Sequence, residues 1–186
     1  NAVQGPQSTP FLLILTPDVE LHADAIGAAL HYLRTQADAV AVNPRCQRPD
    51  GSREYLCKRF PSVADLLLRG FAGSGLRVRF DGRLARYEYR DLVDGREHEV
   101  ELLSGACLLC RRAAFDAVGG FDDAFFLYFE DFDLSRRLAC HGRLVLLPTM
   151  EALHHGGFAA RKGLRHQVWF ARSALRFFRR HGWRWR

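Results

Sequence analysis

Three short stretches of this sequence place acidic or histidine side chains at the predicted end of a strand or start of a helix. They are Asp18, the carboxylates within residues 130–133, and His154-His155. Open α/β sheets bind their ligands at the ends of strands, next to the helices that follow. These stretches are therefore the candidates for a functional site.

Asp18 follows the apolar run Phe11–Leu15, which has the length of a buried strand, and Pro17 ends that strand. A carboxylate at this point can hold a divalent cation or accept a hydrogen bond from a ribose hydroxyl. Aspartate in such a turn also commonly caps the next helix. Asp18 alone leaves both interpretations open.

Three carboxylates, Glu130, Asp131 and Asp133, stand at the predicted start of a helix. The helix dipole lowers the cost of clustering negative charge there. Repulsion between neighbouring carboxylates raises the pKa of one of them toward the value that a general base needs. A solvated helix end is the ordinary alternative. The phenylalanines that flank the acids favour a site with an apolar wall instead.

Two histidines and two glycines follow one another at residues 154–157. A histidine at a strand end can ligate a metal ion, and glycines let a phosphate approach the backbone. A structural or merely exposed histidine pair is the alternative for His154 and His155.

The five cysteines include the pair Cys107 and Cys110, whose spacing occurs in zinc knuckles and redox pairs. Two leucines separate these thiols and the sequence has no second such pair. We therefore interpret them as buried strand residues, and all five cysteines as free thiols of a reducing compartment.

The elements expected to position these residues begin with a strand at Phe11–Leu15, a helix after Asp24 and a strand at Ala39–Val42. This β-loop-α-β order predicts an α/β protein with a parallel sheet. The helix is expected to bury Ile26 and Leu33.

Further along, the pattern predicts two short helices, a helix with acidic residues at its start, and a pair of strands around Ser104-Gly105. Residues 71–101, with dense mixed charge, are expected to form a surface excursion with hairpin-like pieces. Strands are predicted at Arg143–Leu147 and Ala152–His155, separated by Pro148.

The chain has 186 residues, of which 48% are hydrophobic and 26% charged, as in an ordinary soluble domain with a core. This excludes a disordered chain and a disulfide-built miniprotein. The net charge is +6, yet nine of the 27 bases and no acid lie from Arg161 onward, which leaves 18 bases against 21 acids before it. This basic amphipathic segment suggests contact with an anionic membrane or polyanion, or a helix packed on the domain with its arginines in water.

Several segments, taken in order, resemble family 2 glycosyltransferases, and in particular the rhamnosyltransferase-like branch that builds bacterial surface polysaccharides. The resemblance covers nearly the whole chain and rests on Leu15-Thr-Pro-Asp-Val-Glu-Leu21, Cys57-Lys-Arg-Phe-Pro61, residues 103–112, residues 118–137, Gly142 and residues 148–154.

This resemblance implies a GT-A fold, which is a Rossmann-like α/β domain, here truncated at its N-terminus and followed by the basic helix. Residues 1–160 would form the partial catalytic domain and residues 161–186 the helix. The site roles that the resemblance implies are Asp131 as general base with Glu130 beside it, Asp18 and His154 as metal ligands, and Asp18, Ser104, Gly105 and Arg59 as substrate-binding residues.

The implied activity is that of a hexosyltransferase, which transfers a sugar such as rhamnose with inversion and depends on Mg²⁺ or Mn²⁺. The implied donor is a nucleotide sugar linked to dTDP, UDP or GDP, and the acceptor is a saccharide or a lipid-linked sugar. We expect a cytoplasmic location, with a peripheral contact at the inner face of the cell membrane.

Two departures from the family pattern matter. Thr16 stands where many relatives have Asn or Asp. The opening half that grips the nucleotide has no counterpart in this sequence, so it would be lost, lie on a segment outside this sequence, or be supplied by a second chain. The alternative function is a non-catalytic remnant or accessory module that binds sugar or a partner protein. Nucleic acid is not expected as a partner, because the chain outside its basic segment is acidic.

Overall fold

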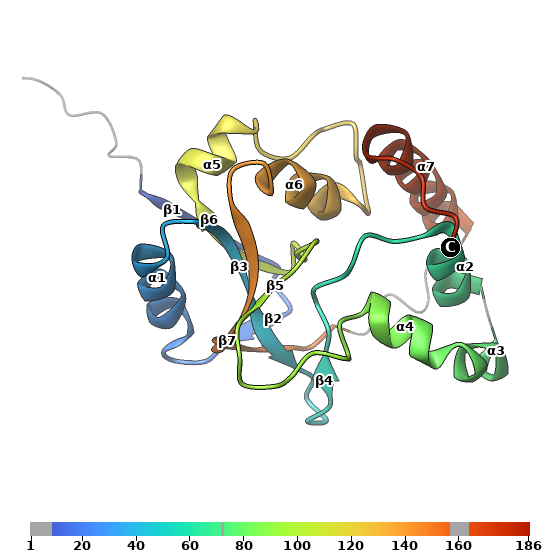
Figure 1. Ribbon diagram of the computed structural model, residues 1–186, viewed down its shortest axis with the longest axis horizontal. Helices are drawn as coiled ribbons and strands as arrows, with labels where there is room; N and C mark the ends of the chain where they lie inside the picture. The colour runs from blue at the N-terminus through green and yellow to red at the C-terminus, as the bar shows by residue number, and fades with distance from the viewer. Residues whose placement is uncertain (1–8, 72, 157–163) are drawn as a thin grey trace, which may run out of the picture.

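The computed structural model describes residues 9–71, 73–156 and 164–186 (Figure 1). Seven strands in this part of the chain form one sheet. They are β1 (Phe11–Leu15), β2 (Val19–Leu21), β3 (Ala39–Gln47), β4 (Arg53–Glu54), β5 (His98–Glu99), β6 (Cys107–Arg111) and β7 (Arg143–His154).

The sheet is mixed rather than parallel. Its order is β1-β6-β3-β7-β2, with β4 paired to β3 and β5 to β7. The pairing of β3 with β7 is parallel, and the other pairings recorded in the described residues are antiparallel. The predicted parallel sheet is therefore wrong, because β6 inserts between β1 and β3 and runs opposite to both.

Helices cover both faces of the sheet (Figure 1). One core cluster lies between the sheet and α1, where Ala29 and Leu33 are fully buried. A second lies on the other face, where Leu134 and Leu138 of α6 are buried. The helices are α1 (Ala25–Thr35), α2 (Val63–Phe71), α3 (Ser74–Arg79), α4 (Asp81–Tyr87), α5 (Arg112–Ala117), α6 (Glu130–Leu138) and α7 (Leu164–His181).

Helix α1 forms as predicted, but its buried face is rotated from the expected one. Ala25, Ala29 and Leu33 are buried, whereas Ile26 is 42% exposed. The small alanines let the helix lie close to the sheet, so the face is set by packing rather than by the largest side chains. Asp24 holds the N-cap position without a side-chain capping bond.

The cysteines of β6 lie on opposite faces of the sheet. Cys107 belongs to the cluster under α1 and Cys110 to the cluster under α6. Burial raises the pKa of each thiol to about 12. Two buried thiols on opposite faces cannot share a metal ion, which agrees with their interpretation as free strand residues.

Two predicted segments differ from the structure. Residues 71–101 contain helices α3 and α4 and the short β5 instead of hairpins, because Leu84 and Tyr87, spaced by one helical turn, are buried. Pro148 does not separate two strands. It lies in an irregularity of β7, where Pro44 pairs with Leu147 and Arg45 pairs with Glu151.

Helix α7 packs against α6 through a third, aromatic cluster in which Phe177 and Phe178 are buried. The fully buried Asp133 accepts a hydrogen bond from His181 at 2.8 Å. The opposite side of α7 is exposed and includes the apolar side chains of Val168 and Leu175. The predicted boundary at residues 160 and 161 lies outside the described residues. Among the helices that the structure describes, none is long and apolar enough to cross a membrane.

Candidate active site

A cavity of about 550 Å³ brings together residues that are far apart in the sequence. Four of the predicted site residues line it: Ser104, Glu130, Asp131 and His154. The rest of its wall includes the acid Glu54 together with aromatic and basic side chains: Tyr55, Lys58, Arg69, Tyr87, Tyr128, Phe129, Phe132, His166 and Phe170.

Asp131 is clamped by two backbone amides. Gly105 N–H donates to its Oδ2 at 3.0 Å, and Phe132 N–H donates to its Oδ1 at 2.8 Å. A Cβ at Gly105 would lie 3.3 Å from Cβ of Asp131, so any larger residue at position 105 would press on the Asp131 side chain. The Ser104-Gly105 turn therefore orients Asp131.

The start of α6 is conformationally strained. Tyr128 and Phe129 have φ of 67° and 64°, the left-handed region that bulky residues rarely adopt. Such strain persists only where surrounding packing enforces it, and it concentrates at functional sites. Here the buried ring of Phe129 anchors the turn, which delivers Glu130 and Asp131 to the cavity.

The two carboxylates at the start of α6 have raised pKa values. Burial is the largest cause for Asp131, while the amides of Gly105 and Phe132 and the charge of Lys58 oppose it. For Glu130, burial and then the neighbouring Asp131 raise the pKa. Glu130 Oε2 is buried without a hydrogen-bond partner among the described residues. Both groups are thus suited to accept a proton or a hydroxyl hydrogen bond.

Asp133, the third acid of the cluster, does not face the cavity. It is fully buried and pairs with Arg137 at 2.8 Å and with His181. Its role is to join α6 to α7, so the cluster divides into two acids at the cavity and one in the core.

Asn43 is a site residue that sequence reasoning missed. Its fully buried side chain accepts from Ser104 N–H at 2.7 Å and donates to the carbonyls of Ser104 and Cys107. This amide fixes the turn that holds Asp131. A polar residue directly after the apolar run Ala39–Val42 and before Pro44 is the signal that could have revealed it.

Asp18 and His154 meet at one end of the site. His154 Nε2 lies 3.2 Å from Asp18 Oδ2. Thr16 Oγ1 donates to Asp18 Oδ1 at 2.6 Å, and this bond is the largest cause of the lowered pKa of Asp18. Thr16 therefore holds the Asp18 carboxylate in place.

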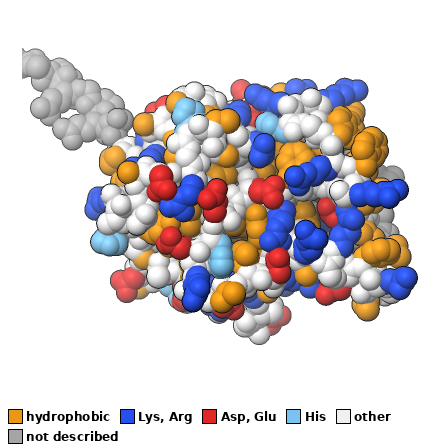
Figure 2. All heavy atoms as spheres, in the orientation of Figure 1, with side chains coloured by type: hydrophobic (Ala, Val, Ile, Leu, Met, Phe, Trp, Pro, Cys, Tyr) orange, Lys and Arg blue, Asp and Glu red, His pale blue; other side chains and the backbone are white. Residues whose placement is uncertain are grey.

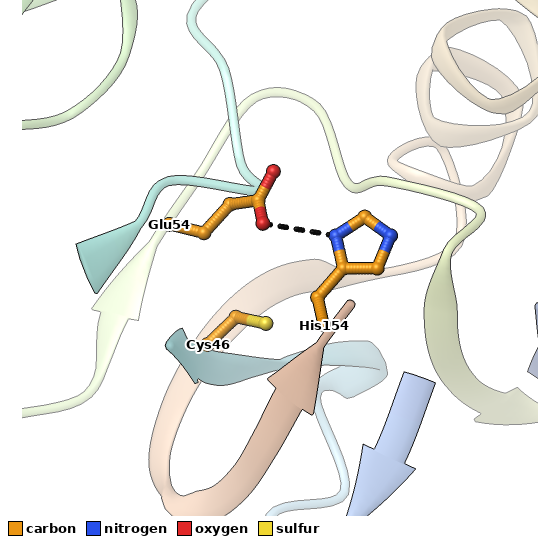
Figure 3. Close-up of side chains that lie close together, drawn as sticks. All are labelled: Cys46, Glu54 and His154. Atoms are coloured by element: carbon orange, nitrogen blue, oxygen red, sulfur yellow. Dashed lines mark hydrogen bonds and ion pairs between the residues drawn. The ribbon is translucent and has the colours of Figure 1, made fainter. Parts of the chain in front are cut away.

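Glu54 is a second residue that the sequence did not reveal. His154 Nδ1 lies 2.9 Å from Glu54 Oε2 (Figure 3), and with Asp18 on its other nitrogen the ring is held between two carboxylates. A ligating histidine that donates its second ring N–H to a carboxylate has its ring orientation and tautomer fixed by that bond. Here Glu54 on Nδ1 leaves Nε2 facing Asp18.

Cys46 lies beside this pair (Figure 3). Its sulfur, a Glu54 oxygen and a His154 nitrogen lie within 4.8 Å of one another, which is a geometry that could hold a metal ion. Burial raises the pKa of the Cys46 thiol to about 11. Mg²⁺ and Mn²⁺ prefer oxygen ligands to sulfur, so we assign Cys46 to packing rather than to the proposed metal site.

Asp18 and His154 fit a divalent cation. Carboxylate oxygen and imidazole nitrogen are ligands that Mn²⁺ accepts, and Mg²⁺ accepts the carboxylate. A Cβ at Gly156 would lie 2.7 Å from Nε2 of His154, so only glycine leaves that nitrogen open.

Arg59 lies apart from the other predicted site residues. Its guanidinium binds Asp91 at 2.8 and 3.0 Å and stacks over the ring of Tyr89. Arg59 is not among the described residues that line the cavity, whereas its neighbour Lys58 is. The structure thus gives no support to Arg59 as a substrate-binding residue.

The fold is that of the GT-A class of glycosyltransferases. A crystal structure of GalNAc-T7 with UDP, GalNAc and Mn²⁺ is similar, with a TM-score of 0.59 over 91% of this chain and 31% of that one, at 12% sequence identity. The chain belongs to the family described as glycosyltransferase like family 2, whose model matches residues 2–185.

Characterised relatives carry rhamnosyltransferase names. N-acetylglucosaminyl-diphospho-decaprenol L-rhamnosyltransferase of Mycobacterium tuberculosis is 36% identical over 152 residues, which are 81% of this chain and 48% of the relative. Rhamnosyltransferase WbbL of Escherichia coli is 26% identical over 180 residues, 94% of this chain and 64% of the relative. The chain spans about half the length of the first relative and less than two thirds of the second.

Proposed function

We propose that this chain forms the acceptor, base and metal region of an inverting glycosyltransferase that moves a sugar such as rhamnose from a nucleotide-sugar donor. The observation that carries the proposal is one cavity lined by both Asp131 and His154, with Asp18 against the histidine. One end offers a base to a hydroxyl group, and the other offers ligands to a metal-bound diphosphate.

Asp131 would act as the general base. Inversion requires a carboxylate behind the acceptor oxygen, on the side away from the leaving group, and no covalent nucleophile on the enzyme. The acceptor hydroxyl would pass its proton to an oxygen of Asp131, whose raised pKa makes it a better proton acceptor than an ordinary aspartate. The amides of Gly105 and Phe132 hold the carboxylate in place during this transfer.

Asp18 and His154 would hold Mg²⁺ or Mn²⁺. When bound, the metal ion neutralises the charge that develops on the departing nucleoside diphosphate. Thr16 and Glu54 keep the two ligands oriented. The Mn²⁺ and UDP in the GalNAc-T7 structure support a divalent metal and a nucleotide donor.

A lipid-linked acceptor is supported by the mycobacterial relative, whose name specifies a sugar on diphospho-decaprenol. A cytoplasmic protein would meet such an acceptor at the inner membrane face. We infer a peripheral contact through the outward stripe of α7, where Val168 and Leu175 are 56% and 39% exposed between the exposed Arg165, Arg172 and Arg179.

Charge favours a membrane as the occupant of this stripe. Helix α7 contains no acidic residue. Lys and Arg side chains gather over the half of the molecule that holds α2–α4 and α7, while acidic and basic groups mix over the sheet (Figure 2). Clustered arginines are attracted to anionic lipid surfaces, and exposed apolar side chains add to such binding.

The accessory-module alternative makes a different prediction, and calorimetric titration with dTDP-, UDP- and GDP-sugars separates the two. An enzyme binds one nucleotide sugar, and binding weakens when Mn²⁺ is replaced by EDTA. A folded protein that binds none of the three sugars and also binds no Mn²⁺ contradicts the proposed function and favours the alternative.

A further inference from the structure

Lys58 is a buried cation that the proposed chemistry does not use. Lys58 is only 5% exposed, yet it lines the same cavity as Asp131 and His154. An ammonium group carries three N–H donors. Among the described residues, its recorded acceptor is the carbonyl of Tyr55.

Among the described residues no carboxylate forms a direct ion pair with this ammonium, although Asp131, Glu88 and Glu54 act on it at longer range. Glu54 is bound to His154 and lies 3.6 Å from Arg48, while Glu88 pairs with Arg90 at 3.3 Å. No ion pair of Lys58 within 4.0 Å is recorded in the described part of the chain. Burying an unpaired charge is costly, so its retention in a cavity wall calls for a partner that arrives from outside.

A second cation faces the same space. Arg69 lines the cavity, and its charge, after burial itself, is among the causes that lower the pKa of Lys58 to about 8. Arg69 itself pairs with Glu88 at 3.8 Å, so of the two cations Lys58 is the one without an ion pair recorded in the described residues. Lys58 is the better fixed of the two, because Arg69 is 52% exposed at its side chain.

The backbone places Lys58 beside the catalytic turn. Lys58 and Leu102 exchange two hydrogen bonds, at 3.0 and 3.1 Å, in an isolated bridge. Two residues after Leu102 the Ser104-Gly105 turn begins, and the amide of Gly105 donates to Asp131. An anion at Lys58 would therefore have a fixed position relative to the base.

We propose that Lys58 is a phosphate-binding group of the active-site cavity and binds the diphosphate of a substrate. The identification of the anion as a diphosphate ester rests on the proposed function, in which both the nucleotide-sugar donor and a lipid-linked acceptor carry that group. An ammonium donates charge-assisted hydrogen bonds to phosphate oxygens without needing a defined plane, which suits a group at the end of a flexible side chain.

The test is calorimetric titration of the protein with inorganic pyrophosphate in EDTA, so that no metal ion contributes. Wild type should bind, and Lys58→Met should bind at least about tenfold more weakly, since a hydrogen bond to a charged group is lost. Lys58→Arg keeps the charge and should bind more tightly than Lys58→Met. Arg34→Met, which removes an exposed charge from the last turn of α1, is the matched control and should bind as wild type does.

Two further titrations distinguish the source of the diphosphate. Loss of UDP affinity in Lys58→Met, measured with Mn²⁺, assigns the group to the donor. Loss of affinity for farnesyl diphosphate assigns it to the acceptor. Unchanged pyrophosphate affinity in Lys58→Met, no binding by wild type, or an equal loss in Arg34→Met would overturn the proposal.

Folding and the proposed function are checked separately. Lys58→Met should unfold at a temperature no lower than wild type, because it removes a buried charge. If it is less stable, Lys58→Gln is titrated instead under the same criteria. Pyrophosphate binding that depends on Lys58 in a protein without sugar transfer would contradict the proposed function and leave this site standing.

Discussion

The amide of Gly105 donates to Oδ2 of Asp131 at 3.0 Å, across 26 residues of sequence. This bond joins the turn after Leu103 to the first turn of α6. Because a Cβ at residue 105 would press on Cβ of Asp131 at 3.3 Å, the position of the carboxylate depends on a glycine.

Gly105→Ala should lower kcat by about 10- to 100-fold, because small displacements of a catalytic group cost that much. Steady-state kinetics and thermal unfolding check it together. Gly27→Ala is the matched control, since a Cβ there meets nothing within 4 Å, and helix α1 should gain roughly 0.5–1 kcal/mol of stability. Equal activity in both variants would show that Gly105 does not position Asp131.

Glu54→Gln should weaken Mn²⁺ binding by about 10- to 100-fold, because the carboxylate that orients His154 through Nδ1 is lost. Electron paramagnetic resonance of free Mn²⁺ measures this without any turnover. Glu99→Gln, an exposed change on β5, should leave the affinity unchanged. Wild-type affinity in Glu54→Gln would remove Glu54 from the metal site.

The raised pKa of Asp131 determines where kcat falls on the acid side of its pH profile. A general base works ionised, so kcat should fall as the pH is lowered through that pKa. Burial is the main cause of the rise, and the loss should therefore begin above the ordinary aspartate range of about 4. A profile of kcat against pH that stays level down to that range would contradict the assignment.

Asp133→Asn should destabilise the protein by roughly 3 kcal/mol or more, because it leaves Arg137 and His181 without their buried partner. Urea denaturation measures the change in the free energy of unfolding. Asp123→Asn, an exposed change of the same type, should stay within about 0.5 kcal/mol of wild type. A small effect at Asp133 would mean that the contact between α6 and α7 depends on the aromatic cluster alone.

Replacing Arg172 and Arg179 with glutamine should weaken binding to vesicles rich in anionic lipid by roughly 30-fold, from about 1 kcal/mol for each charge. Co-sedimentation at two salt concentrations measures it, and added salt should weaken wild-type binding. The control replaces Arg34 and Arg96, which are exposed and lie on neither α7 nor α2–α4. An equal loss in both double variants would argue against the stripe on α7 as the contact.

Local patterns predicted the parts of this fold that depend on near neighbours. The strand Phe11–Leu15 and the helix that begins at Glu130 both form as expected. The sheet order was not predictable, because β6 enters between β1 and β3 only when the chain returns some 60 residues later. Leu84 and Tyr87 stand among charged residues in the sequence, so helix α4, which buries them, was not predicted.

The residues of the candidate site also divide into those that the local sequence predicts and those that only the fold reveals. Asp18, Asp131 and His154 were predicted from residue type, position and family resemblance, and the structure brings them to one site. Asn43 and Glu54 act across 61 and 100 residues of sequence, and neither belongs to a motif. The sequence pointed to Arg59 rather than Lys58 as a substrate-binding residue, because only the folded chain reveals which of the two side chains lines the cavity.

The most direct test of the account is a comparison of donor binding and sugar transfer in Asp131→Asn. The account predicts that transfer is abolished, whereas the metal-dependent affinity for the nucleotide sugar stays within about twofold of wild type, since Asp18 and His154 are untouched. Asp123→Asn should match wild type in both measurements. Full transfer activity in Asp131→Asn would contradict the assignment of Asp131 as the base.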